Sequence, residues 1–123
     1  VQGYSGDLLQ VFEEAPELTW MCPKEGFSMC CDDWVIPVTA GNKELAYKFI
    51  DFMTEPKNAA KNIEFTCFSA PVEGAKEFVS EENRTHPGMF IPDEMYKRGE
   101  IILDLGADNA KYIKVWDEIK LAK

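Results

Sequence analysis

Two thiols and two carboxylates lie side by side in the stretch CCDDWVIP, residues 30–37, directly before a short apolar run that begins with tryptophan. Thiolates and carboxylates are metal ligands, and thiolates also carry out redox chemistry. A carboxylate beside aromatic faces can instead hold an organic cation. The stretch therefore leaves three kinds of site open: a metal centre, a redox pair, or one wall of a pocket for a positively charged ligand.

The four cysteines, Cys22, Cys30, Cys31 and Cys67, lack the CxxC spacing of zinc ribbons and thioredoxin-like motifs. Cys30 and Cys31 cannot easily bridge each other, because a disulfide needs Cα atoms about 5.5 Å apart and neighbouring residues lie about 3.8 Å apart. We expect buried or half-buried thiols. A metal-binding or redox domain that uses all four cysteines remains the alternative.

The two aspartates, Asp32 and Asp33, cannot both face one ligand, because successive side chains of an extended segment point to opposite sides. If a cleft holds one of them, Tyr4, Trp34 and Phe68 could supply aromatic faces, each worth about 0.5 to 2 kcal/mol to a desolvated cation. Such an arrangement favours an alkylammonium site over acid–base catalysis.

Enzyme and nucleic-acid signatures are missing from the sequence. The single histidine, His86, lies in a loop rich in proline and glycine, and neither GxSxG nor a phosphate-binding glycine motif occurs. We therefore predict no catalytic residue and no cofactor. The net charge of −9, from 22 acidic and 13 basic residues, disfavours nucleic-acid binding, and no apolar run approaches the roughly 20 residues of a membrane span.

The elements that must position these residues alternate between helices and short strands. Apolar spacing and turn residues predict helices over residues 5–15, 42–54, 55–65, 73–79, 92–99 and 107–123, and strands over residues 18–23 and 34–38. Ser5 and Asn42 are the expected N-caps, and residues 80–92 are expected to be irregular. Alternating strands and helices indicate an α/β fold. The start VQGYSGD suggests the end of an earlier strand, and hence a fragment of a longer protein.

Several motifs in one order give the sequence a resemblance to a known family. YSGD (4–7), PKEG (23–26), CDDWVIP (31–37), NKELAYKFIDFM (42–53), EPKNAAKNIEF (55–65) and DLG (104–106) follow one another. Together they resemble the C-terminal third of bacterial spermidine/putrescine-binding proteins, the extracytoplasmic receptors of polyamine ABC transporters. The resemblance covers nearly all 123 residues.

The resemblance implies a partial, two-lobed periplasmic-binding-protein fold of type II that lacks its N-terminal two thirds. Residues 1–30 and 78–123 would belong to the second lobe and residues 31–77 to the first. A polyamine would bind between the lobes, and an ABC transporter permease would be the protein partner. Without the N-terminal two thirds, surfaces that pack against that part would be exposed. We therefore expect that the chain can self-associate.

The resemblance also implies individual site residues. Asp32 stands where the family has the aspartate that accepts an amine, and Tyr4 stands where it has an aromatic residue. Cys30 replaces a usual tryptophan, Phe68 a frequent tyrosine, and Ile102 an occasional glutamine. These departures imply a pocket with altered walls around a retained carboxylate.

Overall fold

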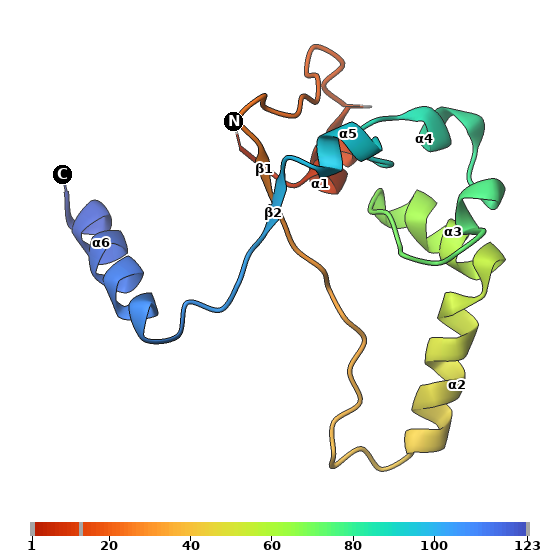
Figure 1. The fold of residues 1–123 in the computed structure, drawn as a ribbon. Coiled ribbons are helices and arrows are strands. Elements are labelled where there is room, and N and C mark those ends of the chain that lie inside the picture. The colour runs from red at the N-terminus through yellow and green to blue at the C-terminus, as the bar shows by residue number, and fades with distance from the viewer. Residues whose placement is uncertain (1, 13, 123) are drawn as a thin grey trace.

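The computed structural model describes residues 2–12 and 14–122 of the chain. Its helices and strands follow in the order shown in Figure 1. They are α1 (Ser5–Val11), β1 (Phe27–Met29), α2 (Lys43–Thr54), α3 (Pro56–Thr66), the 3₁₀ helix η1 (Ala75–Phe78), α4 (Glu81–Thr85), α5 (Asp93–Tyr96), β2 (Gly99–Ile101), the 3₁₀ helix η2 (Gly106–Asp108) and α6 (Asn109–Leu121). No described helix has both the length and the apolar content needed to cross a membrane.

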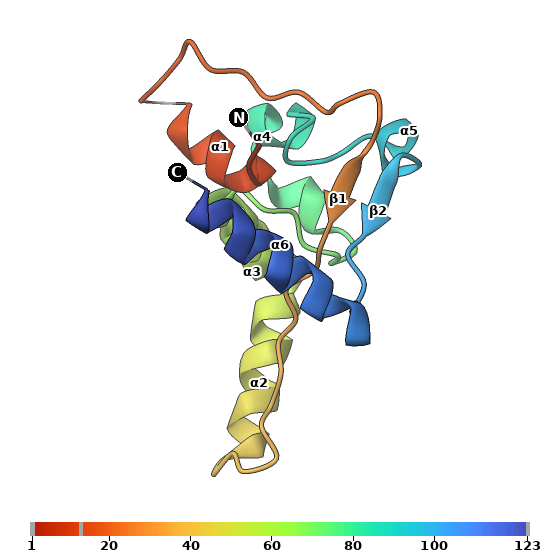
Figure 2. The same cartoon turned by 90° about the vertical axis from the view of Figure 1, so that its left-hand side faces the viewer.

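Strands β1 and β2 form a parallel pair, which Figure 2 shows side by side. The register places Phe27 opposite Gly99 and Met29 opposite Ile101. A Cβ at Gly99 would lie 2.6 Å from the Met29 sulfur, so a larger residue there would displace the Met29 side chain. The chain runs through α2 to α5 between the two strands. Parallel strands joined through helices agree with the predicted α/β fold.

A small core lies where α3 packs against η1. Its buried members are Ala59, Ala60, Ile63, Ala75, Val79 and Met89, and Leu9 and Phe90 pack against them. The alanines on one face of α3 allow close approach, and Ile63 is fully buried at the centre. The core combines residues from all three segments of the predicted lobe division. That division stays a prediction.

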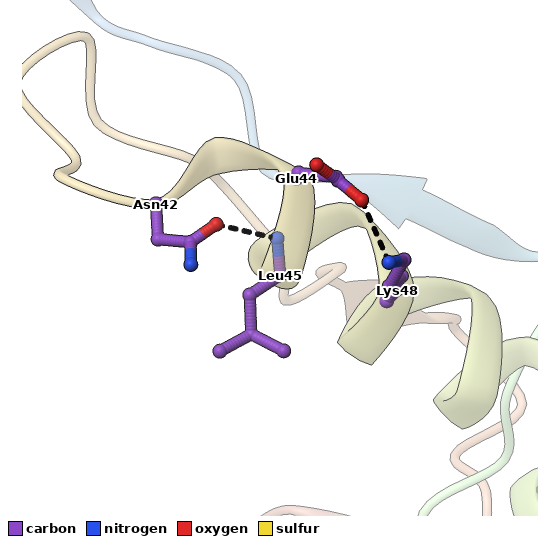
Figure 3. A network of polar contacts seen from close by, with 4 residues as sticks. All are labelled: Asn42, Glu44, Leu45 and Lys48. Carbon is purple, nitrogen blue, oxygen red and sulfur yellow. Dashed lines mark hydrogen bonds and ion pairs between the residues drawn. The ribbon is translucent and has the colours of Figure 1, made fainter.

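The N-cap of α2 is Asn42, as predicted (Figure 3). Its Oδ1 accepts a hydrogen bond of 2.9 Å from the Leu45 backbone N–H, which satisfies one of the free donors in the first turn. Lys48 and Glu44 form an exposed ion pair of 2.7 Å one turn further along. Helix α3 begins at Pro56, also as predicted, because a first-turn proline lacks only an N–H that would have no partner in the helix.

The helical spacing of Leu45, Phe49, Phe52 and Met53 predicts one buried face on α2, and this prediction is wrong. Leu45, Phe49 and Phe52 are on that face, and each side chain is about half exposed or more. Helix α2 contacts α3, and its half-buried residues are Ala46, Ile50 and Met53. The predicted strand at residues 34–38 is also absent, since no described strand pairs with it and Val35 is 79% exposed. Trp34 contacts Phe49 edge-on, with ring centroids 5.3 Å apart.

Three further expectations need correction. Residues 18–23 form no strand, and the strand begins at Phe27, inside the predicted turn, where it can pair with β2. Tyr4, not Ser5, is the N-cap of α1, and its side chain makes no capping hydrogen bond. Residues 80–92 are not wholly irregular, because α4 occupies part of them before Pro87.

Glu64 ties α3 to the start of α4. Its Oε1 accepts a hydrogen bond of 2.7 Å from the Ser80 backbone N–H. This bond, helped by the Ser80 hydroxyl and Asn83, lowers the pKa of Glu64 below the ordinary value of 4.5. The carboxylate thus replaces the missing intrahelical partner at the N-cap of α4.

Replacing Glu64 by glutamine should lower the free energy of unfolding at neutral pH by a few tenths to about 1 kcal/mol, because the site is exposed and screened. A lowered folded-state pKa means that the stabilisation is present above pH 4.5 and is lost as the pH falls through the folded-state value. Denaturant unfolding of both proteins between about pH 3 and pH 7 tests this linkage. A difference that keeps its neutral-pH size at pH 3 would contradict it.

Candidate functional site

The carboxyl ends of β1 and β2 place two predicted site residues next to each other. Cys30 follows β1 and Ile102 follows β2, one step beyond the pair Met29 and Ile101. The Ile102 N–H donates a hydrogen bond of 3.1 Å to the Met29 carbonyl, which extends the pairing past the strand end. Both side chains are exposed. Ligands of open α/β sheets bind outside the carboxyl ends of the strands, so this edge is a candidate site.

Asp32 lies three residues beyond the end of β1, on the extended segment that leaves the sheet. Its side chain is exposed. Within residues 2–12 and 14–122 no hydrogen bond or ion pair engages its carboxylate, nor that of its neighbour Asp33. Asp32 is therefore a negative charge available to a ligand beside the strand ends.

Tyr4 and Phe68 are brought to a second place, where the start of α1 meets the end of α3. Cys67 ends α3 in the left-handed conformation, with φ of 58°, and the following residue turns toward α1. The ring of Phe68 lies against Gly6 in the first turn of α1, directly after Tyr4 and Ser5. Gln10 fixes the two helices together by donating a hydrogen bond of 2.9 Å to the Thr66 carbonyl.

Gly6, within the YSGD motif, has a packing role that the resemblance did not indicate. It is buried, and a Cβ there would lie 2.6 to 2.7 Å from three atoms of the Phe68 ring. The signal was present in the sequence, because a glycine in the first turn of a helix costs about 1 kcal/mol relative to alanine and so indicates a packing requirement. Gly6 thus sets where the Phe68 ring can lie.

Replacing Gly6 by alanine should destabilise the chain by about 1 to 2 kcal/mol, because the added methyl group overlaps the Phe68 ring and displaces it. Thermal unfolding measures the cost. A second substitution, Phe68→Ala, removes the overlap. It should therefore lower the stability less in a chain that already carries Gly6→Ala than in the unmodified chain. Costs that add without coupling would show that the two residues do not touch.

The structure therefore groups the predicted residues in two places. Cys30, Asp32 and Ile102 gather at the strand ends, and Tyr4 and Phe68 at the α1–α3 junction. No hydrogen bond or ion pair links the two places within the described residues. A hollow of about 290 Å³ lies beside the strands and includes Ile102, Ser28 and Arg98 in its wall.

The cysteines do not converge on one point. The expectation of buried or half-buried thiols is wrong for Cys30 and Cys31, which are exposed and adjacent, and holds for the half-buried Cys22 and Cys67. Cys22 donates a weak hydrogen bond to the Pro23 carbonyl. Cys67 packs at the edge of the core, with its sulfur 4.0 Å from the Glu64 carbonyl oxygen. Among the described residues, no three side chains of His, Cys, Asp or Glu form a group that could hold a metal ion. The metal or redox alternative is therefore not favoured.

Comparison with known proteins identifies similar chains. Residues 1–90 match the family described as bacterial extracellular solute-binding protein. The putrescine/cadaverine-binding protein of Pseudomonas aeruginosa is 30% identical over 97% of this chain and 36% of its own length. The spermidine/putrescine-binding periplasmic protein of Escherichia coli is 30% identical over 87% of this chain and 30% of its own. The chain thus spans about a third of the length of these relatives.

A solved structure also resembles the fold. A chain assigned to a spermidine/putrescine ABC transporter of Listeria monocytogenes superimposes with a TM-score of 0.79 and 27% identity. The match covers 97% of this chain and 37% of that one. The arrangement of helices and strands in Figure 1 is thus part of a periplasmic-binding-protein fold, as predicted.

Proposed function

We propose, from the premise that this chain belongs to the bacterial extracellular solute-binding proteins, that it forms about a third of a receptor for putrescine, spermidine or a related polyamine. One observation carries the proposal. A carboxylate with no partner among the described residues, Asp32, lies just beyond the carboxyl end of a parallel strand in a chain similar to polyamine-binding proteins along nearly its whole length.

Asp32 is the proposed partner of one ammonium group. An ammonium that enters a cleft loses water, and a carboxylate that accepts its hydrogen bonds offsets that cost. Tyr4 and Phe68 are the proposed aromatic walls along the methylene chain, and Cys30 and Ile102 the lining between them. All five side chains are open to solvent in this chain, which suits a cleft with one side still to be covered.

The segments in which the chain passes between the two predicted lobes are the proposed hinge. One of them is residues 30–42, which lead from β1 toward α2. In Figure 1 this segment leaves the sheet and runs alone to α2. Closure there would bring the two lobes around one ligand. The receptor would then bind and deliver its ligand without chemical change.

Location and partner follow from the family. We place the receptor outside the cytoplasm, in the periplasm or on the outer face of the cell membrane, and infer an ABC transporter permease as its docking partner. Two names support these inferences, since the Escherichia coli relative is named a periplasmic protein and the similar structure is assigned to an ABC transporter.

A thermal-shift panel on the full-length protein tests the proposed ligand class. Putrescine, cadaverine and spermidine at about 100 times their dissociation constant should each stabilise a true receptor by about 2.7 kcal/mol, a shift of several degrees. Amino acids, sugars and inorganic anions at equal concentration serve as controls. A response to one of those classes and not to diamines would replace the proposal.

The 123-residue chain alone should bind polyamine weakly or not at all, because about two thirds of the relatives' length is absent from it. Titration calorimetry of the isolated chain measures this. Micromolar affinity in the isolated chain would mean that the whole site lies within these residues.

A further inference from the structure

The chain exposes far more surface than a folded domain of its mass. Its accessible surface is 10367 Å², whereas a folded monomer of 14.0 kDa exposes about 6,700 Å². The difference, about 3,700 Å², is surface that a compact protein of this size would bury. Large apolar side chains account for much of it, since only six hydrophobic residues are buried among those described.

Helix α6 carries the best defined of the open faces. Tyr112, Val115, Trp116 and Ile119 recur at helical spacing, and each side chain is more than half exposed. With Lys111 they line a hollow of about 410 Å³ on the helix surface. The ion pairs Lys114–Glu118 and Lys120–Asp117 lie outside this apolar face. A helix with one apolar face normally buries that face.

No described element covers this face. Helix α6 makes its main contacts with η2, the short helix that precedes it. In Figure 1 it lies on the opposite side of the two strands from α2, whose own face of Leu45, Phe49 and Phe52 is also open. Two separate arms therefore each present largely exposed apolar side chains, with Trp34 packed edge-on against Phe49 of α2.

Two occupants could cover these apolar faces: a second copy of the chain, or additional polypeptide of the same protein. The amount of exposed surface distinguishes between them. A second copy that formed an interface of ordinary size would cover about 800 Å² of each chain, roughly a fifth of the excess. The relatives, in contrast, carry about two thirds of their length in addition to the part matched here. The similar solved structure holds the same arrangement of elements within a chain of which this one covers 37%. Additional polypeptide of that size can cover both arms at once.

We propose that the apolar face of α6 is an intramolecular interface, covered in the full-length protein by the polypeptide that corresponds to the other two thirds of the relatives. The occupant is a predominantly apolar face of that polypeptide, packed into the hollow around Trp116. This inference concerns assembly of the fold and holds whichever solute the receptor binds.

A pair of variants in the full-length protein tests the proposal. Trp116→Glu places a carboxylate in the apolar face, and Ala110→Glu places one outside that face on the same helix. We expect the first to lower the melting temperature by roughly 5 to 10 °C and the second by no more than about 1 °C. Hydrogen exchange of the unmodified protein gives a second measurement, and the amides of α6 should exchange at least about 100-fold more slowly than an open helix.

Equal melting temperatures for the two variants, together with fast exchange along α6, would overturn the proposal. So would a full-length protein that is a dimer and becomes a monomer on Trp116→Glu, since a second copy would then be the occupant. If Trp116→Glu prevents folding while Ala110→Glu folds normally, the exchange measurement on the unmodified protein decides the question.

Discussion

Replacing Asp32 by asparagine in the full-length protein should lower its affinity for putrescine by roughly 30- to 1,000-fold. The change keeps the shape of the side chain and removes its charge, so the ammonium of the bound ligand would be desolvated without a counter-ion. Truncating one partner of a desolvated charge pair costs about 2 to 4 kcal/mol, and each 1.4 kcal/mol is about tenfold in affinity. Titration calorimetry with putrescine measures the loss.

Asp33→Asn is the matched control for Asp32→Asn. The two aspartates are adjacent, both are exposed, and their carboxylates accept no hydrogen bond from the described residues. Because they point to opposite sides of an extended segment, only one should face the cleft. We expect Asp33→Asn to change the affinity by less than about threefold, the scale of a distant surface charge. A larger loss for Asp33 than for Asp32 would mean that the wrong side of the segment was assigned to the ligand.

Replacing Ile63 by alanine should lower the free energy of unfolding by about 2 to 5 kcal/mol. Ile63 is fully buried at the centre of the core, and its neighbours Ala59, Ala60 and Ala75 are too small to fill the cavity left behind. Such a loss is a large part of the stability of a typical domain. Thermal or denaturant unfolding measures it.

Phe65→Ala is the control for the core substitution. Phe65 lies on the same helix, two residues further along, and its side chain is 85% exposed. We expect a cost of no more than about 0.5 kcal/mol in the 123-residue chain. Similar costs for Ile63 and Phe65 in that chain would show that α3 does not pack on η1 through Ile63.

Local signals in the sequence predicted the helices well, because helix ends depend on nearby residues. Asn42 caps α2 and Pro56 opens α3 as expected. The closing helix α6 occupies most of residues 107–123, as predicted. Each of these features follows from capping, proline geometry or 3.6-residue spacing, and none needs a distant partner.

Strands and burial could not be predicted in the same way, because both depend on residues far away in the chain. The β-branched run at residues 34–38 has the composition of a strand, but no described strand pairs with it. Phe27–Met29 has no strong strand signal, yet it pairs with Gly99–Ile101 about seventy residues later. The apolar residues that recur at helical spacing on α2 and α6 remain largely exposed, because burial depends on elements outside the two helices.

In the candidate site, too, the residue types could be predicted from the sequence, but their arrangement depended on contacts between distant residues. The resemblance supplied Asp32, Cys30 and Ile102, and the structure brings all three to the strand ends because β1 and β2 are parallel and in register. Composition alone could not give that pairing. The role of Gly6 beneath Phe68 needed the coordinates, since the contact joins α1 to a residue sixty positions away.

Calorimetric titration of the full-length protein with putrescine, beside 1,4-butanediol as its uncharged counterpart, tests the central claim most directly. The two molecules have the same four-carbon chain and differ in their ammonium groups. The proposed receptor should bind putrescine at one site with micromolar or tighter affinity and give no measurable binding to the diol. Failure to bind any polyamine, or equal binding of putrescine and the diol, would contradict a cation site built on Asp32.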